Sequence, residues 1–169
     1  MPGFVIHIAI GQEYLKKHNN EKQYRDFIMG NIDPDLTNEK FKTHYGKSPA
    51  YSSLKEFLNS NKLDNSLNKG RFLHLITDYL FYNYYLDRIS KGILHNDYDL
   101  TNKDLMKKYN VVLPDEIKEF VYFKEGNPEI LSLDLAMKVI DEISGLDINE
   151  IEKELKDGNL KWETYKKLV

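Results

Sequence analysis

Residues 70–78 read Gly70-Arg71-Phe72-Leu73-His74-Leu75-Ile76-Thr77-Asp78. Steps of four residues place Gly70, His74 and Asp78 on one face of a helix. Apolar residues surround the two polar side chains, so we expect both to be buried, where an ionised aspartate requires a partner. The stretch therefore predicts a helix that carries either a pair of metal ligands or a core histidine hydrogen-bonded to the aspartate one turn later.

Helical periodicity continues on both sides of this stretch, and no strand pattern of comparable length competes with it. We expect helices over residues 4–17, 21–29, 53–59, 67–90, from a start at 101–104 through 108, and over 115–123, 133–144 and 151–156. The helix over 67–90 is predicted to be the longest. Ser132 and Asp147 are expected to cap the last two helices. The fold class predicted is all-α.

Composition favours one domain. The chain has 169 residues, of which 41% are hydrophobic, enough for a single core. We expect one helical domain over 1–169, with candidate ligands in about 1–100 and a helical layer in about 101–169. An apolar face that includes Leu131, Val139 and Ile143 predicts that this layer packs on the ligand-bearing helices.

Charge and cysteine content exclude several classes of protein. There is no cysteine, which excludes disulfides and thiolate metal sites. A net charge of −3, from 24 basic and 27 acidic residues, gives no electrostatic footprint for nucleic-acid binding. No apolar run approaches the roughly 20 residues of a membrane span, and no export signal begins the chain. A cytoplasmic protein without a transmembrane segment is expected.

Candidate metal ligands recur along the first half of the chain. His7 lies in the first predicted helix, while Asp35 and His44 lie in a connection of about twenty residues, a length typical of functional loops. Together with His74 and Asp78 they form a nitrogen and oxygen ligand set suited to zinc, iron or manganese. Asp33, which precedes a proline, is more simply explained as a turn residue.

Four short motifs occur in a fixed order. They are Met1-Pro2-Gly3-Phe4-Val5-Ile6-His7, Gly30-Asn31-Ile32-Asp33-Pro34-Asp35, Lys42-Thr43-His44-Tyr45 and residues 70–78. In this order the chain resembles the zinc-dependent phospholipase C family, in particular its short bacterial relatives, over about the first hundred residues. The resemblance implies an all-helical bundle in which His7, Asp35, His44, His74 and Asp78 converge on divalent metal, most simply zinc, with Asp78 as a bridging carboxylate.

The chain departs from the secreted members of that family after Asp78. A downstream histidine pair and glutamate that complete their three-metal cluster are missing, because the only later histidine is His95. We therefore expect one or two ions.

The function predicted is metal-dependent phosphoester hydrolysis by activated water, with Asp35 and Asp78 as catalytic carboxylates. The substrate would be a small phosphoester or a phospholipid head group. A noncatalytic metal-binding or interaction protein that retains a degenerate site is the alternative, and the missing downstream ligands favour it.

Five further residues are candidates for an additional ligand or a substrate contact. His95 and Asp97 are expected in a loop between helices, Tyr82 lies one turn after Asp78, and Lys42 and Arg71 could contact phosphate. Each has a simpler explanation: a connecting turn for His95 and Asp97, core packing for Tyr82, and solvated surface charge for the two cations.

Overall fold

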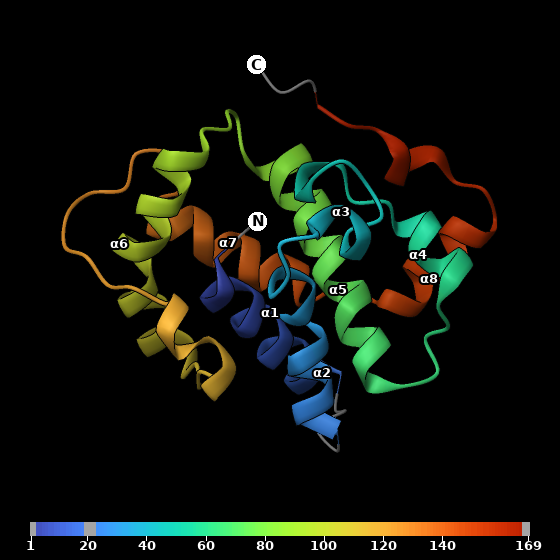
Figure 1. Ribbon diagram of the computed structural model, residues 1–169, viewed down its shortest axis with the longest axis horizontal. Helices are drawn as coiled ribbons and strands as arrows, with labels where there is room; N and C mark the ends of the chain where they lie inside the picture. The colour runs from blue at the N-terminus through green and yellow to red at the C-terminus, as the bar shows by residue number, and fades with distance from the viewer. Residues whose placement is uncertain (1–2, 19–22, 167–169) are drawn as a thin grey trace.

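The computed structural model describes residues 3–18 and 23–166, and within these ranges the chain forms helices and no strand (Figure 1). The α-helices are α1 (Phe4–Lys17), α2 (Tyr24–Gly30), α3 (Lys40–Thr43), α4 (Leu54–Ser60), α5 (Ser66–Leu80), α6 (Lys91–Tyr109), α7 (Leu133–Ile143) and α8 (Ile148–Lys156). A π-helical turn, η4 (Phe81–Tyr85), continues α5, and 3₁₀ turns form η2 (Asp33–Asp35), η3 (Pro49–Tyr51), η5 (Asp115–Phe120) and η6 (Leu160–Glu163). The prediction of an all-α chain is confirmed.

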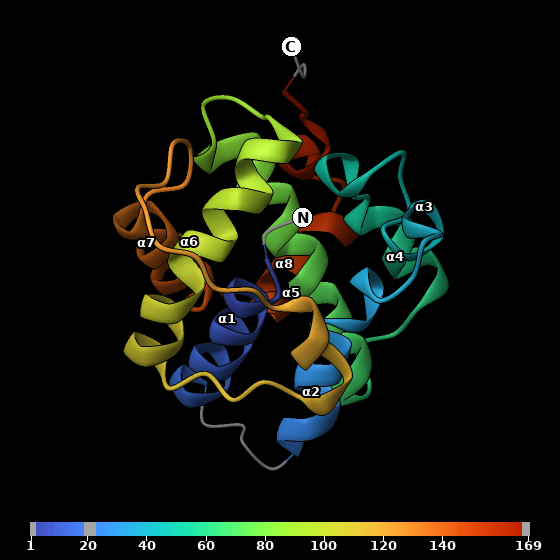
Figure 2. The ribbon, with the colours of Figure 1, turned by 60° about the vertical axis from the view of Figure 1, so that its left-hand side comes forward.

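Helix α5 occupies the centre of the molecule, as Figures 1 and 2 both show. Helix α2 lies along it, while α1, α6 and α7 pack against one another on one side and α4 and α8 on the other. The C-terminal helices pack on two sides of the ligand-bearing part rather than as the single layer expected, because α7 contacts α1 and α6 whereas α8 contacts α4 and α5. Val139, Ile140 and Ile143 of α7 are fully buried, and Ser132 and Asp147 cap α7 and α8 as predicted.

Two glycines allow α2 and α5 to touch backbone to backbone. A Cβ at Gly30 would lie 2.1 Å from the Leu67 carbonyl oxygen, and one at Gly70 would lie 2.1 Å from that of Phe27. Real Cβ atoms do not approach a backbone oxygen so closely. Only glycine fits at these two positions, and the close approach brings the end of α2 beside the face of α5 that carries His74.

The region between α5 and α7 differs from the prediction. α5 with its π-helical turn ends at Tyr85, five residues before the predicted end at 90, and α6, with 19 residues, is the longest α-helix described. It includes His95 and Asp97, so their placement in a loop was wrong, as was a helix start at 101–104. The local sequence favours a turn, but Leu94, Tyr98 and Leu105 are buried at helical spacing, and this packing outweighs it.

The connection after α2 is more structured than a plain loop, since η2, α3 and η3 all lie within it. Helix α2 begins at Tyr24; the expected start at 21 falls outside the described residues. After Pro114 a 3₁₀ turn that ends at Phe120 replaces the longer helix predicted over 115–123. In the described ranges no helix combines the length and the apolar character needed to cross a membrane.

Candidate metal centre

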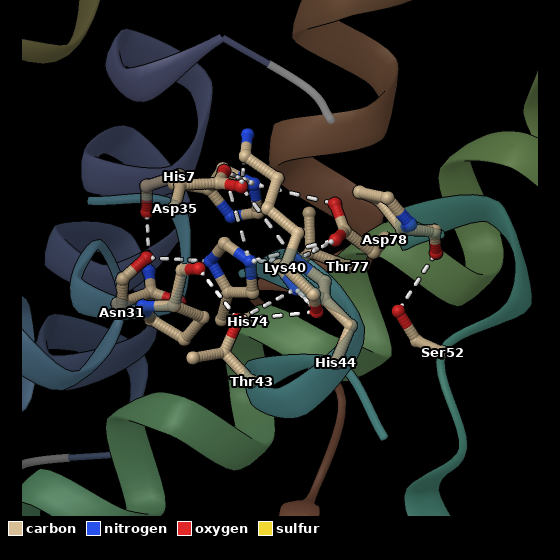
Figure 3. Close-up of polar contacts among 12 residues, drawn as sticks. His7, Asn31, Asp35, Lys40, Thr43, His44, Ser52, His74, Thr77 and Asp78 are labelled. Carbon is tan, nitrogen blue, oxygen red and sulfur yellow. Dashed lines mark hydrogen bonds and ion pairs between the residues drawn. The ribbon is translucent and has the colours of Figure 1, made fainter. Parts of the chain in front are cut away.

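The five predicted ligands meet in the interior, although they come from four parts of the chain. His7 lies on α1, Asp35 ends η2, His44 follows α3, and His74 and Asp78 lie one turn apart on α5. Their side chains point toward one another and are fully buried (Figure 3). We call these residues the five-residue cluster.

Distances within the cluster match those between ligands of a common ion. Asp78 Oδ2 lies 2.9 Å from His44 Nε2 and 3.4 Å from His74 Nε2, while Asp78 Oδ1 lies 3.5 Å from His7 Nε2. Asp35 lies 3.6–3.9 Å from the same three nitrogens. Ligands bound at zinc distances of about 2.0–2.2 Å in tetrahedral geometry are roughly 3.3–3.6 Å apart. Little rearrangement is therefore needed to bind an ion.

Backbone contacts fix the orientation of two imidazoles. His44 Nδ1 lies 2.9 Å from the Lys40 carbonyl oxygen, and His74 Nδ1 lies 2.9 Å from that of Asn31. A carbonyl only accepts, so each Nδ1 carries a proton, and the Nε2 atom of each ring faces the cluster. These two Nε2 atoms are 3.1 Å apart. Two lone pairs at this distance repel each other unless a proton or a metal ion lies between them.

The carboxylates and histidines also influence one another's protonation. Burial, reinforced by the charge of His74, lowers the pKa of His7 to about 4, so that this ring is neutral at pH 7. Burial opposes ionisation of Asp78, yet the charge of His74 and the close imidazoles of His44 and His7 hold the pKa of Asp78 well below its usual range. For His74 the lowering by burial is outweighed by Asp78 and Asp35, which raise its pKa. Asp78 is thus ionised and His7 neutral, the forms in which both residues bind metal.

Several buried polar atoms of the cluster lack a hydrogen-bond partner among the described residues. They are both ring nitrogens of His7, Asp35 Oδ2 and both carboxylate oxygens of Asp78. Buried polar groups left in this state are costly and uncommon. Two overlapping sets, His7 with Asp35 and His74, and His44 with His74 and Asp78, each place their ligand atoms within 4.8 Å of one another. The residues present therefore fit a divalent metal ion.

Two supporting residues were not anticipated from the sequence. Asn31 is fully buried; its side-chain amide donates to the His7 carbonyl oxygen, and its own carbonyl oxygen accepts from His74. Lys40 Nζ lies 2.9 Å from Asp35 Oδ1. The sequence does contain a signal for Asn31, because this polar residue follows Gly30 and lies between Ile28 and Ile32, which are both buried. Nothing in the sequence distinguishes Lys40 from the other lysines.

Three of the additional candidates lie outside the cluster. Lys42 forms an exposed ion pair with Glu39, and Arg71 binds both carboxylate oxygens of Asp33, which agrees with a turn role for that aspartate rather than a ligand role. Asp97 is fully buried in α6, where its carboxylate accepts hydrogen bonds at 2.7–2.9 Å from three successive backbone N–H groups at 129–131. These contacts give Asp97 a role in holding the segment before α7.

The remaining two candidates, Tyr82 and His95, line a common pocket on the side of the cluster where Lys40 lies. Tyr82 is nearly buried and packs edge to face on Phe81, which confirms that it contributes to the core.

Comparison of the chain with protein-family models, with curated proteins and with solved structures gave no match. The resemblance to zinc-dependent phospholipases C thus rests on the four motifs and their order.

Proposed function

We propose that this chain is a metal-dependent hydrolase of phosphoesters and that the five-residue cluster binds its metal. The observation that carries the proposal is the 3.1 Å approach of the Nε2 atoms of His44 and His74, two rings whose Nδ1 atoms each contact a backbone carbonyl oxygen. Beside them lie carboxylate oxygens that have no hydrogen-bond partner among the described residues. Nitrogen and oxygen ligands without sulfur suit zinc first, and iron or manganese as alternatives. The order of the four sequence motifs, which resembles that of zinc-dependent phospholipases C, also supports phosphoester hydrolysis.

The arrangement of Asp78 supports its proposed role as a bridge between two ions. One of its oxygens faces His7 and the other faces His44 and His74. A bound ion of this type polarises phosphoryl oxygens and lowers the pKa of a water ligand toward neutrality. Asp35 holds Lys40 through Oδ1, while its Oδ2, which has no hydrogen-bond partner in the described part of the chain, can orient a water molecule or accept a proton from it.

The proposal is tested by turnover of p-nitrophenyl phosphate and bis(p-nitrophenyl) phosphate with zinc-loaded protein. We expect activity in the wild type, and loss of both zinc and activity in His74→Ala and Asp78→Ala, with the helical circular dichroism signal retained. Asp33→Asn is the matched control, because Asp33 lies outside the cluster and pairs with Arg71. Absence of turnover of either ester by zinc-loaded wild type would contradict the proposal.

A noncatalytic metal-binding protein is the second candidate, and one observation favours it. The side chains of all five ligands have no solvent exposure, which suits a structural ion better than one that must meet a substrate. In that case a chelator would lower the melting temperature by several degrees or more, as expected when an ion stabilises only the folded state, with no turnover to lose.

A further inference from the structure

A pocket of about 290 Å³ is lined in part by Lys40, the residue that contacts Asp35 of the five-residue cluster. Helix α6 forms one wall with Lys91, Leu94, His95 and Tyr98, and Lys40 and Tyr82 lie among the residues that complete it. Its volume is near the lower end of the roughly 300–1,000 Å³ typical of small-molecule sites. This volume corresponds to that of about ten water molecules at roughly 30 Å³ each, which is enough for an organic group about the size of one six-membered ring.

Three of the lining residues connect this pocket to the cluster. Lys40 reaches from the pocket wall to Asp35, which it contacts at 2.9 Å. Tyr82 follows Asp78 by one helical turn. Burial first, and then the nearby charges of Asp78 and Asp35, raise the pKa of Tyr98 well above its usual value, as expected for a phenol close to both carboxylates. A molecule in the pocket would therefore lie next to the proposed metal centre.

The charged residues that line the pocket are cations, Lys40 and Lys91, and none of the described lining residues is acidic. Burial first, and then nearby cations that include Lys91, lower the pKa of His95, while Asp99 opposes this shift. Asp99 is itself paired with Lys124 at 2.9 Å. Lys91 begins α6, and the first turn of that helix has no acidic residue. A cation at this end of a helix is unfavourable by a few tenths of a kcal/mol or more, so helix stability does not account for Lys91.

We propose that this pocket binds the organic part of the substrate and that its cations select an anionic phosphoester with a small apolar body over one with a cationic head group. The inference rests on the proposed function, since the scissile phosphate would lie at the metal centre beside Lys40. Apolar contact comes from Tyr82, Leu94 and Tyr98, and positive charge comes from Lys91 together with Lys40. Burial lowers the pKa of His95, so this residue contributes a neutral imidazole that can donate a hydrogen bond.

Binding of phenylphosphonate, whose C–P bond a phosphoesterase does not cleave, and of phenyltrimethylammonium to zinc-loaded protein, measured by calorimetry, tests the pocket without turnover. We expect phenylphosphonate to bind and the cation not to bind. Lys91→Glu should weaken phenylphosphonate binding about fivefold or more, because it reverses the charge of an exposed lysine that lines the pocket. Lys103→Glu, an exposed lysine on the same helix, should change affinity little. Ile89→Trp, in the loop before α6, should block the pocket and reduce binding.

The outcomes separate this inference from the proposed function. Equal turnover rates for p-nitrophenyl phosphate and p-nitrophenylphosphorylcholine, with both rates unchanged in Lys91→Glu and Ile89→Trp, would contradict the proposed role of the pocket. The proposed phosphoesterase activity would still stand. Lys91-dependent binding of phenylphosphonate, without turnover of p-nitrophenyl phosphate, would support the proposed pocket and contradict the proposed phosphoesterase activity. Equal loss of binding in Lys91→Glu and Lys103→Glu would show an effect of net charge alone and would also overturn the pocket.

Discussion

Replacing Gly70 with alanine should separate α2 from α5 and loosen the metal centre. The new Cβ would lie 2.1 Å from the Phe27 carbonyl oxygen, about 1.3 Å short of the 3.4 Å at which ordinary contact begins. A shift of this size would stretch the 2.9 Å contact between His74 Nδ1 and the Asn31 carbonyl oxygen beyond hydrogen-bonding range. His74 would then lose the contact that fixes its tautomer.

The expected cost follows from three contributions. Overpacking costs about 1–3 kcal/mol, loss of the buried hydrogen bond costs about 1–2 kcal/mol, and alanine returns somewhat under 1 kcal/mol of helix propensity. The net loss in free energy of unfolding is about 1–4 kcal/mol, measurable by urea unfolding of the metal-free protein followed by circular dichroism. Zinc affinity, measured separately, should fall as well.

A matched control is available in α6. A Cβ at Gly92 would meet nothing within 4 Å, so Gly92→Ala should stabilise the protein by up to about 1 kcal/mol through helix propensity alone. If Gly70→Ala were as stable as the wild type, or bound zinc equally well, the account of how α2 positions His74 would be refuted.

Two further variants distinguish a residue that positions the proposed metal ligands, Asn31, from one that stabilises the fold, Asp97. Asn31→Ala should reduce zinc affinity about tenfold to a hundredfold, because Asn31 holds the backbone of His7 beside the ring of His74; unchanged affinity in a competition titration would contradict this role. Asp97→Ala should leave three backbone N–H groups at 129–131 without their acceptor and lower the free energy of unfolding by about 2–4 kcal/mol. Its zinc content should match the wild type, and loss of zinc with stability retained would instead make Asp97 a ligand.

The convergence of the five predicted ligands could be predicted because each occurs in one of four motifs, and the order of these motifs along the chain carries information that residue spacing alone does not. Helical spacing alone places His74 and Asp78 on one face. It does not place His7 or His44 beside them, since that depends on how α1 and the segment after α3 pack on α5. The prediction of these contacts came from the resemblance, and the distances of 2.9–3.9 Å agree with it.

Other features depended on packing that local sequence does not reveal. Residues 95–104 carry Asn, Asp and Thr, which favour turns and caps, and this led to a loop and a new helix start within what is one continuous helix. There Thr101 Oγ1 donates to the Asp97 carbonyl oxygen one turn earlier, so its hydroxyl is satisfied within the helix. The role of Lys40 likewise arises only from tertiary structure, because its partner Asp35 belongs to a different short helix.

Metal content tests the central claim most directly. Elemental mass spectrometry of the wild type, Asp78→Ala and Asp33→Asn, each purified in parallel and reconstituted with zinc, compares a cluster residue with a nearby aspartate outside the cluster. We predict one or two equivalents of metal in the wild type and in Asp33→Asn, and loss of that metal from Asp78→Ala. No bound metal in the reconstituted wild type, or equal metal in all three proteins, would contradict a metal centre at His7, Asp35, His44, His74 and Asp78.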